Sequence, residues 1–308
     1  MERPSKLAWI TGAGGLIGNY LVQTALKSGS AAIWPASCHE NGTRRQDASA
    51  PGLVVRALTR SDFDLLDFAA VRREFQKDRP QLVIHCAAVT SVAGAQENPD
   101  LARRLNIEVT RLLAELAAEI PFIFFSTDLV FDGRKGNYIE ADAPNPLHLY
   151  GETKAVAEKI VLRNPRHLVV RTSINGGISP SGDRAFNEQL RRALQQAGQG
   201  MKLFTDEFRS PIPAVETARA VWELAGKKGA GIYHVAGAEK LSRWQIGQLL
   251  VNRWPELKAK IEPASARDFP GPPRAADTSL NISKAQGFLE KPLPGLGEWL
   301  AANPNEPF

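Results

Sequence analysis

The chain has 308 residues, 43% of them hydrophobic and 23% charged, which is typical of a soluble globular protein with one large domain or two smaller ones. Its net charge of +5 is modest, and the absence of a dense basic run with interleaved aromatic residues argues against a nucleic-acid partner. Cys38 and Cys86 have no metal-type or redox-type spacing, and no apolar stretch approaches the ~18 residues of a membrane span. We therefore expect a cytoplasmic protein without a membrane partner.

Short apolar runs alternate with helical patterns through the first half of the chain. Strands are predicted at 6–12, 53–59, 81–88, 121–127 and 167–173, and helices near 15–28 and at 69–79, 99–119 and 146–163. Because these strands lack polar alternation and are each followed by a helix, they indicate a parallel sheet buried on both faces. The predicted fold is an α/β domain with a doubly wound, Rossmann-type parallel sheet.

The rest of the chain departs from this rhythm. Residues 35–52 are polar and rich in Gly, Pro and Ser, which predicts a flexible insertion. Beyond about residue 174 the pattern loosens, with helices at 184–198 and near 214–226 and a strand at 231–237. We predict a dinucleotide-binding domain formed by 1–173 plus about 211–237, and a smaller, discontinuous substrate-binding region formed by about 174–210 plus 238–308.

A glycine pattern follows the first predicted strand. The stretch "ITGAGGLIGNYL" places Gly12, Gly15 and Gly18 between a strand and a helix. Such glycines let the chain turn tightly, let the backbone approach a pyrophosphate, and let the helix pack close to the sheet. The N–H groups of the helix start, at Leu16 and Ile17, would face the phosphates. The pattern predicts a dinucleotide site; the alternative is a tight strand-to-helix turn that binds nothing.

The end of the second predicted strand bears on the choice of cofactor. An acidic residue there hydrogen-bonds the ribose of NAD, whereas an arginine accepts the 2′-phosphate of NADP. The sequence "ALTRSDFDLLD" has Thr59 and Arg60 at this point, which favours NADP. Asp62 nearby keeps NAD open as the alternative. Asp64 and Leu65 follow, placed to cover the adenine.

Tyr150 and Lys154 lie four positions apart at the start of a predicted helix, in "LYGETKAVAEK". A tyrosine and a lysine at this spacing are common neighbours on a helix, which is the simpler interpretation. The alternative is catalytic: a nearby ammonium lowers the pKa of a phenol, so that the tyrosine exchanges a proton near neutral pH. The motifs around this pair decide between the two.

These motifs in this order resemble the extended short-chain dehydrogenase/reductase superfamily. Within it, "STDLVFDG", "NPLHLYGETKAVAEK", "VVRTS" and "PPRAADTSLN" are similar to the dTDP-4-dehydrorhamnose reductase branch. The resemblance covers about residues 6–290, except for 30–52. It implies an NADPH-dependent reductase of the 4-keto group of a nucleotide-linked deoxysugar, with NAD as a second option for the cofactor.

The resemblance also implies roles for single residues. Thr127, Tyr150 and Lys154 match the catalytic set: Tyr150 would protonate the ketone oxygen, Lys154 would hold the nicotinamide ribose, and Thr127 would hold the carbonyl. Further cofactor contacts are implied for Ala87, Ala88, Thr90, Asn106, Ser126 and Thr172, and substrate contacts for Asp128, Arg209 and Arg274. Asn106 has a simpler interpretation as a helix residue that satisfies its neighbours, and Arg209 as an ordinary surface arginine.

Four positions on the substrate side depart from the family pattern. Leu129 replaces a tyrosine, Ala275 a proline, Asp277 an asparagine, and Val89 an aromatic residue or histidine. The glycine loop and the Thr–Tyr–Lys set are intact, so the reaction is better defined than the substrate.

Two alternatives remain open at this stage. One is an epimerase or dehydratase of the same superfamily that holds NAD, although a dehydratase would need an acidic pair after the threonine and only Asp128 is present. The other is a non-catalytic dinucleotide-binding regulator, as in the regulatory subunit of methionine adenosyltransferase. A homodimer is one option for the assembly. No metal-ligand pattern stands out, and His85 is expected to be a satisfied core residue.

Overall fold

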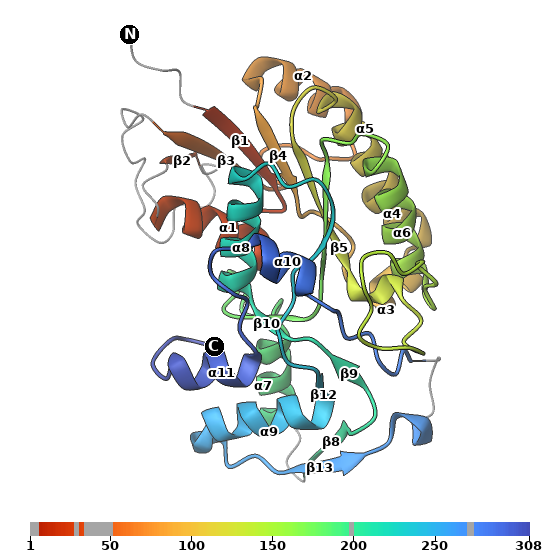
Figure 1. Cartoon of the computed structure of the whole chain (residues 1–308), viewed down its shortest axis with the longest axis vertical. Coiled ribbons are helices and arrows are strands. Elements are labelled where there is room, and N and C mark those ends of the chain that lie inside the picture. The colour runs from red at the N-terminus through yellow and green to blue at the C-terminus, as the bar shows by residue number, and fades with distance from the viewer. Residues whose placement is uncertain (1–5, 28–30, 34–51, 197–199, 270–273) are drawn as a thin grey trace.

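The computed structural model describes residues 6–27, 31–33, 52–196, 200–269 and 274–308. In this part of the chain, helices cover both faces of a seven-stranded parallel sheet (Figure 1), with strand order β11–β6–β5–β4–β1–β3–β2. The strands are β1 (Lys6–Thr11), β2 (Ala31–Ile33), β3 (Leu53–Leu58), β4 (Leu82–His85), β5 (Phe122–Thr127), β6 (Leu168–Thr172) and β11 (Gly231–His234). The order reverses between β1 and β4, and such sheets bind ligands outside the carboxyl ends of their strands at this point.

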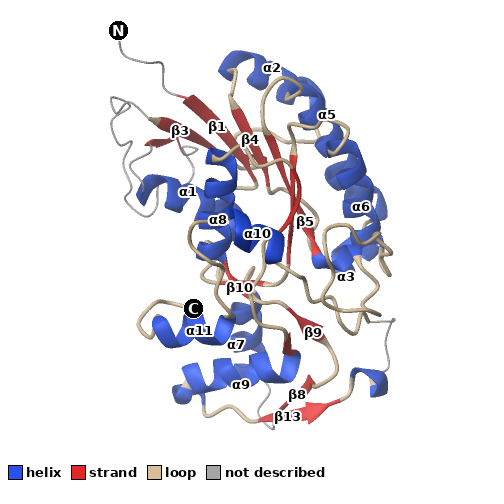
Figure 2. Ribbon diagram, in the orientation of Figure 1, coloured by secondary structure: helices blue, strands red, loops and turns tan. Residues whose placement is uncertain are grey.

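The helices form two layers, one on each face of the sheet (Figure 2). One layer contains α1 (Leu16–Lys27), α8 (Ala214–Gly226) and α10 (Ser283–Phe288). The other contains α2 (Phe68–Asp78), α3 (Val92–Glu97), α4 (Pro99–Arg103), the π-helical turn η2 (Arg104–Glu108), α5 (Val109–Leu116) and α6 (Leu149–Val161). Because successive strand residues point to opposite faces, Trp9 lies in one core and Ile10 in the other, and both are fully buried.

A second, smaller region lies beyond the carboxyl ends of the strands. It contains β7 (Asn175–Gly176), α7 (Phe186–Gln196), β8 (Met201–Phe204), β9 (Phe208–Arg209), β10 (Ile212–Pro213), β12 (Leu241–Ser242), α9 (Arg243–Arg253), β13 (Ile261–Ala264) and α11 (Leu296–Ala302). The second region has its own core, which includes Leu250, Trp254 and Trp299. Short 3₁₀ turns occur in this region at η4 (Pro255–Leu257) and η5 (Ala266–Asp268), and directly after β5 at η3 (Asp128–Val130). The carboxyl ends of the strands therefore face this second region.

The predicted Rossmann-type α/β fold is confirmed, and most predicted elements lie within two or three residues of the observed ones. The predicted strand 81–88 is shorter, at Leu82–His85, and the predicted helix 99–119 contains the π-helical turn. The predicted flexible insertion falls mostly on residues 34–51, outside the described part of the chain.

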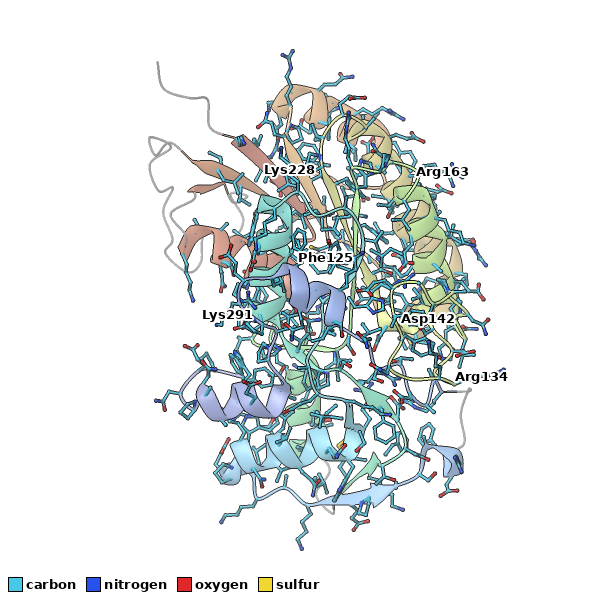
Figure 3. The ribbon with its side chains drawn as sticks, viewed as in Figure 1. Phe125, Arg134, Asp142, Arg163, Lys228 and Lys291 are labelled. Atoms are coloured by element: carbon cyan, nitrogen blue, oxygen red, sulfur yellow. The ribbon has the colours of Figure 1, made fainter. Side chains whose placement is uncertain are left out.

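The domain division stays a prediction, with one difference in the packing. Leu280, Ile282 and Ala285 pack in the core of the sheet, although the prediction assigns them to the second region. Apolar side chains fill the interior and charged side chains lie outside. In Figure 3, Phe125 lies in the interior, and the surface carries Arg134, Arg163, Lys228 and Lys291.

Candidate active site

The glycine loop packs against the end of β4. Gly12 has a φ of +70°, and a Cβ there would lie 2.7 Å from the backbone nitrogen of Ala87. A Cβ on Gly18 would overlap the carbonyl oxygen of Gly12, whereas a Cβ on Gly14 would meet only Thr59 Cγ2, at 3.8 Å. The close approach of loop, strand and helix therefore requires glycine at 12 and 18. The first-turn N–H groups of α1, which lack intrahelical acceptors, lie at this edge of the sheet.

The turn after β3 separates the two candidate partners of the adenosine ribose. The Asp62 carboxylate accepts hydrogen bonds from the backbone nitrogen of Thr59 at 2.8 Å and from its hydroxyl at 3.1 Å. Arg60 is exposed, as is Asp64, and Leu65 is half-buried. Asp62 therefore has a structural task in the turn, while the Arg60 side chain is accessible to a phosphate.

Asn106 connects the loop after β4 to helix α6. Its side-chain oxygen accepts a hydrogen bond from the Val89 nitrogen at 2.8 Å, and its amide donates to the Val89 oxygen at 3.1 Å and to Thr153 Oγ1 at 2.9 Å. Thr153 in turn donates to the Tyr150 carbonyl at 2.7 Å. Asn106 is fully buried, so the structure favours the interpretation that it satisfies its neighbours. Ala87 and Ala88 remain partly accessible beside it.

Thr127, Tyr150 and Lys154 come together at the carboxyl end of β5. Thr127 ends β5 and caps the following turn, because its hydroxyl accepts a hydrogen bond from the Leu129 nitrogen at 3.2 Å. Tyr150 and Lys154 lie in the first two turns of α6. The Lys154 Nζ lies 4.0 Å from the centre of the Phe124 ring. All three catalytic candidates are buried.

Burial determines the proton affinity of this pair. Desolvation raises the pKa of Tyr150 to about 12, assisted by the negative charge of Asp128 and opposed by the hydrogen bond with Thr127. Desolvation also lowers the pKa of Lys154 to about 7, against the opposing influence of Glu158 and Cys86. The pKa of Tyr150 is therefore raised overall, because desolvation is its largest cause, and the lowering by Lys154 that the spacing suggests stays a prediction. Tyr150 is a protonated phenol at neutral pH.

A buried ion pair fixes α6 against β6. Arg171 donates from Nε to Glu158 Oε1 at 3.0 Å and from Nη2 to Oε2 at 2.7 Å, and both side chains are buried. The guanidinium also lies 5.0 Å from the centre of the Phe131 ring. Since Glu158 is one helical turn after Lys154, this two-point contact holds the face of α6 that carries Lys154 toward the sheet.

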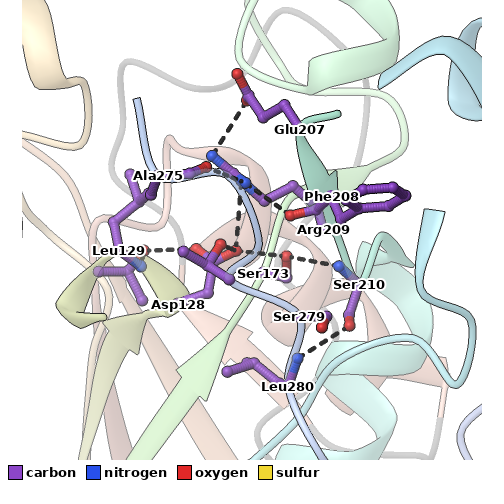
Figure 4. Close-up of polar contacts among 12 residues, drawn as sticks. Asp128, Leu129, Ser173, Glu207, Phe208, Arg209, Ser210, Ala275, Ser279 and Leu280 are labelled. Atoms are coloured by element: carbon purple, nitrogen blue, oxygen red, sulfur yellow. Dashed lines mark hydrogen bonds and ion pairs between the residues drawn. The ribbon is translucent and has the colours of Figure 1, made fainter. Parts of the chain in front are cut away.

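Asp128 lies at the junction of the two regions (Figure 4). Its Oδ1 accepts a hydrogen bond from Thr127 Oγ1 at 3.1 Å. Its Oδ2 accepts from Ser173 at 2.7 Å and from Thr278 at 3.0 Å, and lies 3.8 Å from Arg209 Nε. The residue is 3% exposed. Asp128 therefore connects the end of β5 to three segments that are distant in the sequence.

Three arginines surround one buried carboxylate. Glu207 is fully buried and pairs with Arg209 Nη2 at 3.1 Å, Arg243 Nε at 2.9 Å and Arg274 Nε at 2.5 Å. Burial would raise the pKa of Glu207, but the hydrogen bond from Arg274 and the charges of Arg243 and Arg209 lower it to about 2. We call Asp128, Glu207 and these three arginines the substrate-side cluster. It combines three positive and two negative charges, and Arg243 and Arg274 are partly exposed.

Several predicted site residues have clear positions in the structure. Arg209 is 5% exposed, so the interpretation as an ordinary surface arginine is wrong, and Arg274 is partly exposed beside it. Ser126 Oγ is buried without a hydrogen-bond partner in the described residues. Thr172 is buried and accepts a hydrogen bond from Asn175, and Thr90 is exposed. His85 is a satisfied core residue, as predicted, with one ring nitrogen 2.7 Å from Thr11 Oγ1 and the other 3.2 Å from Thr110 Oγ1.

Sequence reasoning missed Glu207, Arg243 and Thr278 as members of the site, and it placed Ser173 only at a strand end near the nicotinamide. The acidic residue two positions before Arg209, in "DEFRSP", was a usable signal for a buried partner. Ser173 and Thr278 lie within the motifs "VVRTS" and "PPRAADTSLN", whereas Arg243 lies outside any motif. Over the described residues, no group of three or more His, Cys, Asp or Glu is arranged to hold a metal ion. None of the described helices is both long and apolar enough to span a bilayer.

Residues 7–301 match the family model described as "RmlD substrate binding domain". A probable low-salt glycan biosynthesis reductase, Agl14, of Haloferax volcanii is 31% identical over 305 residues, which cover 96% of each chain. Methionine adenosyltransferase 2 subunit beta of Xenopus laevis is 30% identical over 292 residues, which cover 92% of this chain and 82% of that protein.

Solved structures are similar over almost the whole chain. A hypothetical dTDP-4-dehydrorhamnose reductase from Sulfolobus tokodaii has a TM-score of 0.74 and 29% identity, covering 94% of this chain and 97% of that one. A dTDP-4-dehydrorhamnose reductase from Bacillus anthracis, solved in complex with NADP, has a TM-score of 0.78 and 23% identity, covering 97% and 98%. At this identity the second similarity concerns the fold alone.

Proposed function

Since the chain belongs to the RmlD substrate-binding-domain family, in the dTDP-4-dehydrorhamnose reductase branch of the extended short-chain dehydrogenases/reductases, we propose that it is an NADPH-dependent reductase of the 4-keto group of a nucleotide-linked deoxysugar. The observation that carries the proposal is the set Thr127, Tyr150 and Lys154 at the carboxyl end of β5, with Tyr150 protonated beside Thr127.

The residues present fit a dinucleotide cofactor. The glycine loop leaves its backbone N–H groups at the switch point of the sheet, and the Ser126 hydroxyl is buried without a partner in the described residues, as expected of a group that serves a ligand. Arg60 is exposed where a 2′-phosphate would lie, which supports NADP over NAD, with NAD as the second cofactor. The bound cofactor supplies the hydride.

Tyr150 is the proton donor of the proposed reaction. A phenol whose pKa is raised to about 12 stays protonated over the whole physiological range, so it can give its proton to the ketone oxygen as the carbonyl carbon is reduced. Lys154, on the same face of α6, would hold the ribose hydroxyls and keep the nicotinamide in line. The partly exposed Arg243 and Arg274 supply positive charge for an anionic nucleotide group on the substrate side.

The test is Tyr150→Phe on a 4-keto deoxysugar nucleotide, starting with dTDP-4-dehydrorhamnose. Loss of the phenol should lower kcat by roughly 10²–10⁴-fold while the Kd for NADPH is unchanged, because a general acid contributes about that factor. Loss of NADPH absorbance measures turnover, and quenching of NADPH fluorescence measures binding.

Tyr233→Phe is the matched control, since Tyr233 is an equally buried tyrosine that packs against Phe288. It should keep kcat within about twofold, as for a substitution that removes no catalytic group. Equal turnover by wild type and Tyr150→Phe on every keto-sugar that reacts would contradict the assigned role.

A regulatory role is the second candidate, because a protein named methionine adenosyltransferase 2 subunit beta matches 92% of this chain. The intact Thr127–Tyr150–Lys154 set opposes it. Binding of NADPH without turnover on a broad keto-sugar panel would favour this role. Purified protein that carries tightly held NAD would instead favour an epimerase.

A further inference from the structure

A single phenol connects helix α1 to the segment between β7 and α7. Tyr20 Oη accepts a hydrogen bond from the Ile178 nitrogen at 3.1 Å. The preceding backbone is equally close, because a Cβ on Gly177, whose φ is +148°, would lie 2.7 Å from Tyr20 Oη. Among the described residues, this is the one hydrogen bond that joins the 177–185 segment to the sheet or its covering helices. The contact therefore requires both the phenol and a glycine at 177.

The other hydrogen bonds of this segment lie within the second region. Asn187, in the first turn of α7, accepts a hydrogen bond from the Gly177 nitrogen at 2.9 Å and donates to the Gly177 carbonyl oxygen at 3.0 Å. The Glu188 carboxylate accepts from the Ser179 nitrogen at 2.8 Å, from the Ser179 hydroxyl at 2.6 Å and from the Ala185 nitrogen at 2.9 Å. The segment therefore folds back onto the start of α7 as one unit, and Tyr20 attaches that unit to α1.

The segment borders the edge of the sheet that would bind a dinucleotide. It begins next to the carboxyl end of β6, where Asn175 donates a hydrogen bond to Thr172 Oγ1 at 2.9 Å. It ends at Ala185, which packs with Leu16 in the first turn of α1. Leu16 and Tyr20 are four positions apart and therefore lie on one face of α1. The segment thus runs from the end of β6 to the helix start whose N–H groups would face a pyrophosphate.

We propose that Tyr20 is a positioning residue of the cofactor site, which holds the 177–185 segment against the start of α1 and so slows the release of a bound dinucleotide. The inference rests on the proposed function, in which the glycine loop binds NADPH. Tyr20 acts through Ile178 and need not touch the cofactor. Without this hydrogen bond the segment keeps its contacts with Asn187 and Glu188 but separates from α1, which leaves a bound pyrophosphate open to solvent on that side.

The experiment compares Tyr20→Phe with Trp222→Phe. Tyr20→Phe keeps the ring and removes the oxygen that accepts from Ile178. Trp222→Phe is the matched control, because it removes a different hydrogen bond to α1, donated by Trp222 Nε1 to the Leu21 carbonyl oxygen at 2.9 Å, that does not involve the segment. Stopped-flow displacement of bound NADPH, followed by its fluorescence, gives koff for each protein. Urea unfolding gives the stability of each protein.

In Tyr20→Phe, koff for NADPH should rise by roughly three- to tenfold, the equivalent of one hydrogen bond. In Trp222→Phe, koff should stay at the wild-type value even where stability is lost. An unchanged koff in Tyr20→Phe, or an equal rise in both variants, would overturn the inference. If Tyr20→Phe does not fold, Gly177→Ala tests the same contact, because its Cβ would force the segment away from the phenol and should raise koff as well.

Amide hydrogen exchange provides a readout that does not depend on turnover. In the wild type, NADP⁺ should slow exchange both in the glycine loop and in peptides that cover 177–185. In Tyr20→Phe, the glycine loop should still be protected, whereas the protection of the segment should be reduced. A merely structural role would change the exchange of the segment equally with and without NADP⁺. Protection of the glycine loop alone in the wild type would contradict the inference.

The two proposals fail in different ways. If the wild type binds NADPH but reduces no keto-sugar, the reductase proposal fails, and koff together with hydrogen exchange still decides the role of Tyr20. If keto-sugars are reduced and koff is the same in wild type and Tyr20→Phe, the reductase proposal stands and the role of Tyr20 is overturned.

Discussion

The two sides of the site are built in different ways. The edge that we propose binds the cofactor is mainly backbone, and its shape depends on missing side chains at glycines. It is formed by the Gly12–Gly18 loop, the turn after β3 and the end of β4. The substrate-side cluster of Asp128, Glu207, Arg209, Arg243 and Arg274 is mainly charged side chains brought together from distant segments. The first is specified locally and the second only by the complete fold.

This difference has an energetic consequence. A glycine loop fails when a Cβ is added, through overlap and an unfavourable φ, so the damage stays near the loop. A buried charge cluster fails when one charge is removed, because the remaining charges stay desolvated without a partner. Substitutions in the glycine loop should therefore affect mainly cofactor binding. Substitutions in the substrate-side cluster should affect mainly the free energy of unfolding.

The largest effect is expected for Glu207→Gln. Three arginines would lose their shared carboxylate, and removal of one partner from a buried ion pair costs about 3 kcal/mol or more in the free energy of unfolding. Urea unfolding measures the change. The control is Glu119→Gln, whose carboxylate forms an exposed pair with Arg166 and should contribute less than ~1 kcal/mol. Equal losses in both variants would mean that the cluster does not stabilise the fold.

Gly12→Ala should have the next largest effect, and on the other side of the comparison. The new Cβ would crowd the Ala87 nitrogen at a φ of +70°, a strain of about 1–3 kcal/mol. The loop would then have to move from the place where we propose that it meets the cofactor. We expect the Kd for NADPH to rise by tenfold or more. Gly14→Ala is the matched control, because its Cβ would meet only Thr59 at an ordinary distance. Equal NADPH affinity of the two variants would contradict the packing argument.

Arg60→Ala should change the cofactor preference more than the rate. A hydrogen bond to a charged group contributes about 1.5 kcal/mol or more, so KM for NADPH should rise by roughly tenfold while KM for NADH stays the same. Steady-state kinetics with both cofactors measures the two values. A similar rise in both KM values would mean that Arg60 contacts a part of the cofactor that NADPH and NADH share.

The smallest effect is expected for a moderate fall in pH, measured as a change in the free energy of unfolding. The pKa of Glu207 is lowered to about 2 in the folded protein, so its carboxylate contributes stability that is fully present above the unfolded value of about 4.5 and is lost as the pH falls toward 2. Urea midpoints at pH 7, 5, 4 and 3 should show this contribution unchanged to pH 5 and declining below. In Glu207→Gln this part of the decline should be absent.

The sequence was sufficient to predict the features that depend on neighbouring residues in the chain. The strand–helix alternation, the glycine loop and the spacing of Tyr150 and Lys154 are each read from neighbouring residues, and the fold and the family are confirmed. The raised pKa of Tyr150 was not predicted, because it depends on the depth of burial rather than on spacing. The hydrogen bond between Asp128 and Thr278 joins residues 150 positions apart, and no local pattern identifies such a pair.

The short strands of the second region were missed for a related reason. Pairs such as β9 with β12 contain two residues each, too few for a periodic pattern, and they form because the tertiary structure places them side by side.

The π-helical turn η2 determines where the Asn106 side chain lies. Such a turn contains one residue more than an α-helical path between the same ends, and here the extra residue is accommodated where Asn106 reaches both Val89 and Thr153. Loss of one residue within Arg104–Glu108 would convert the turn to ordinary α-helix and leave the ends of α4 and α5 nearly in place. The side chains within the turn would change direction, and the hydrogen bonds from Asn106 to Val89 and Thr153 would be lost. The extra residue therefore serves the position of one side chain rather than the course of the helix.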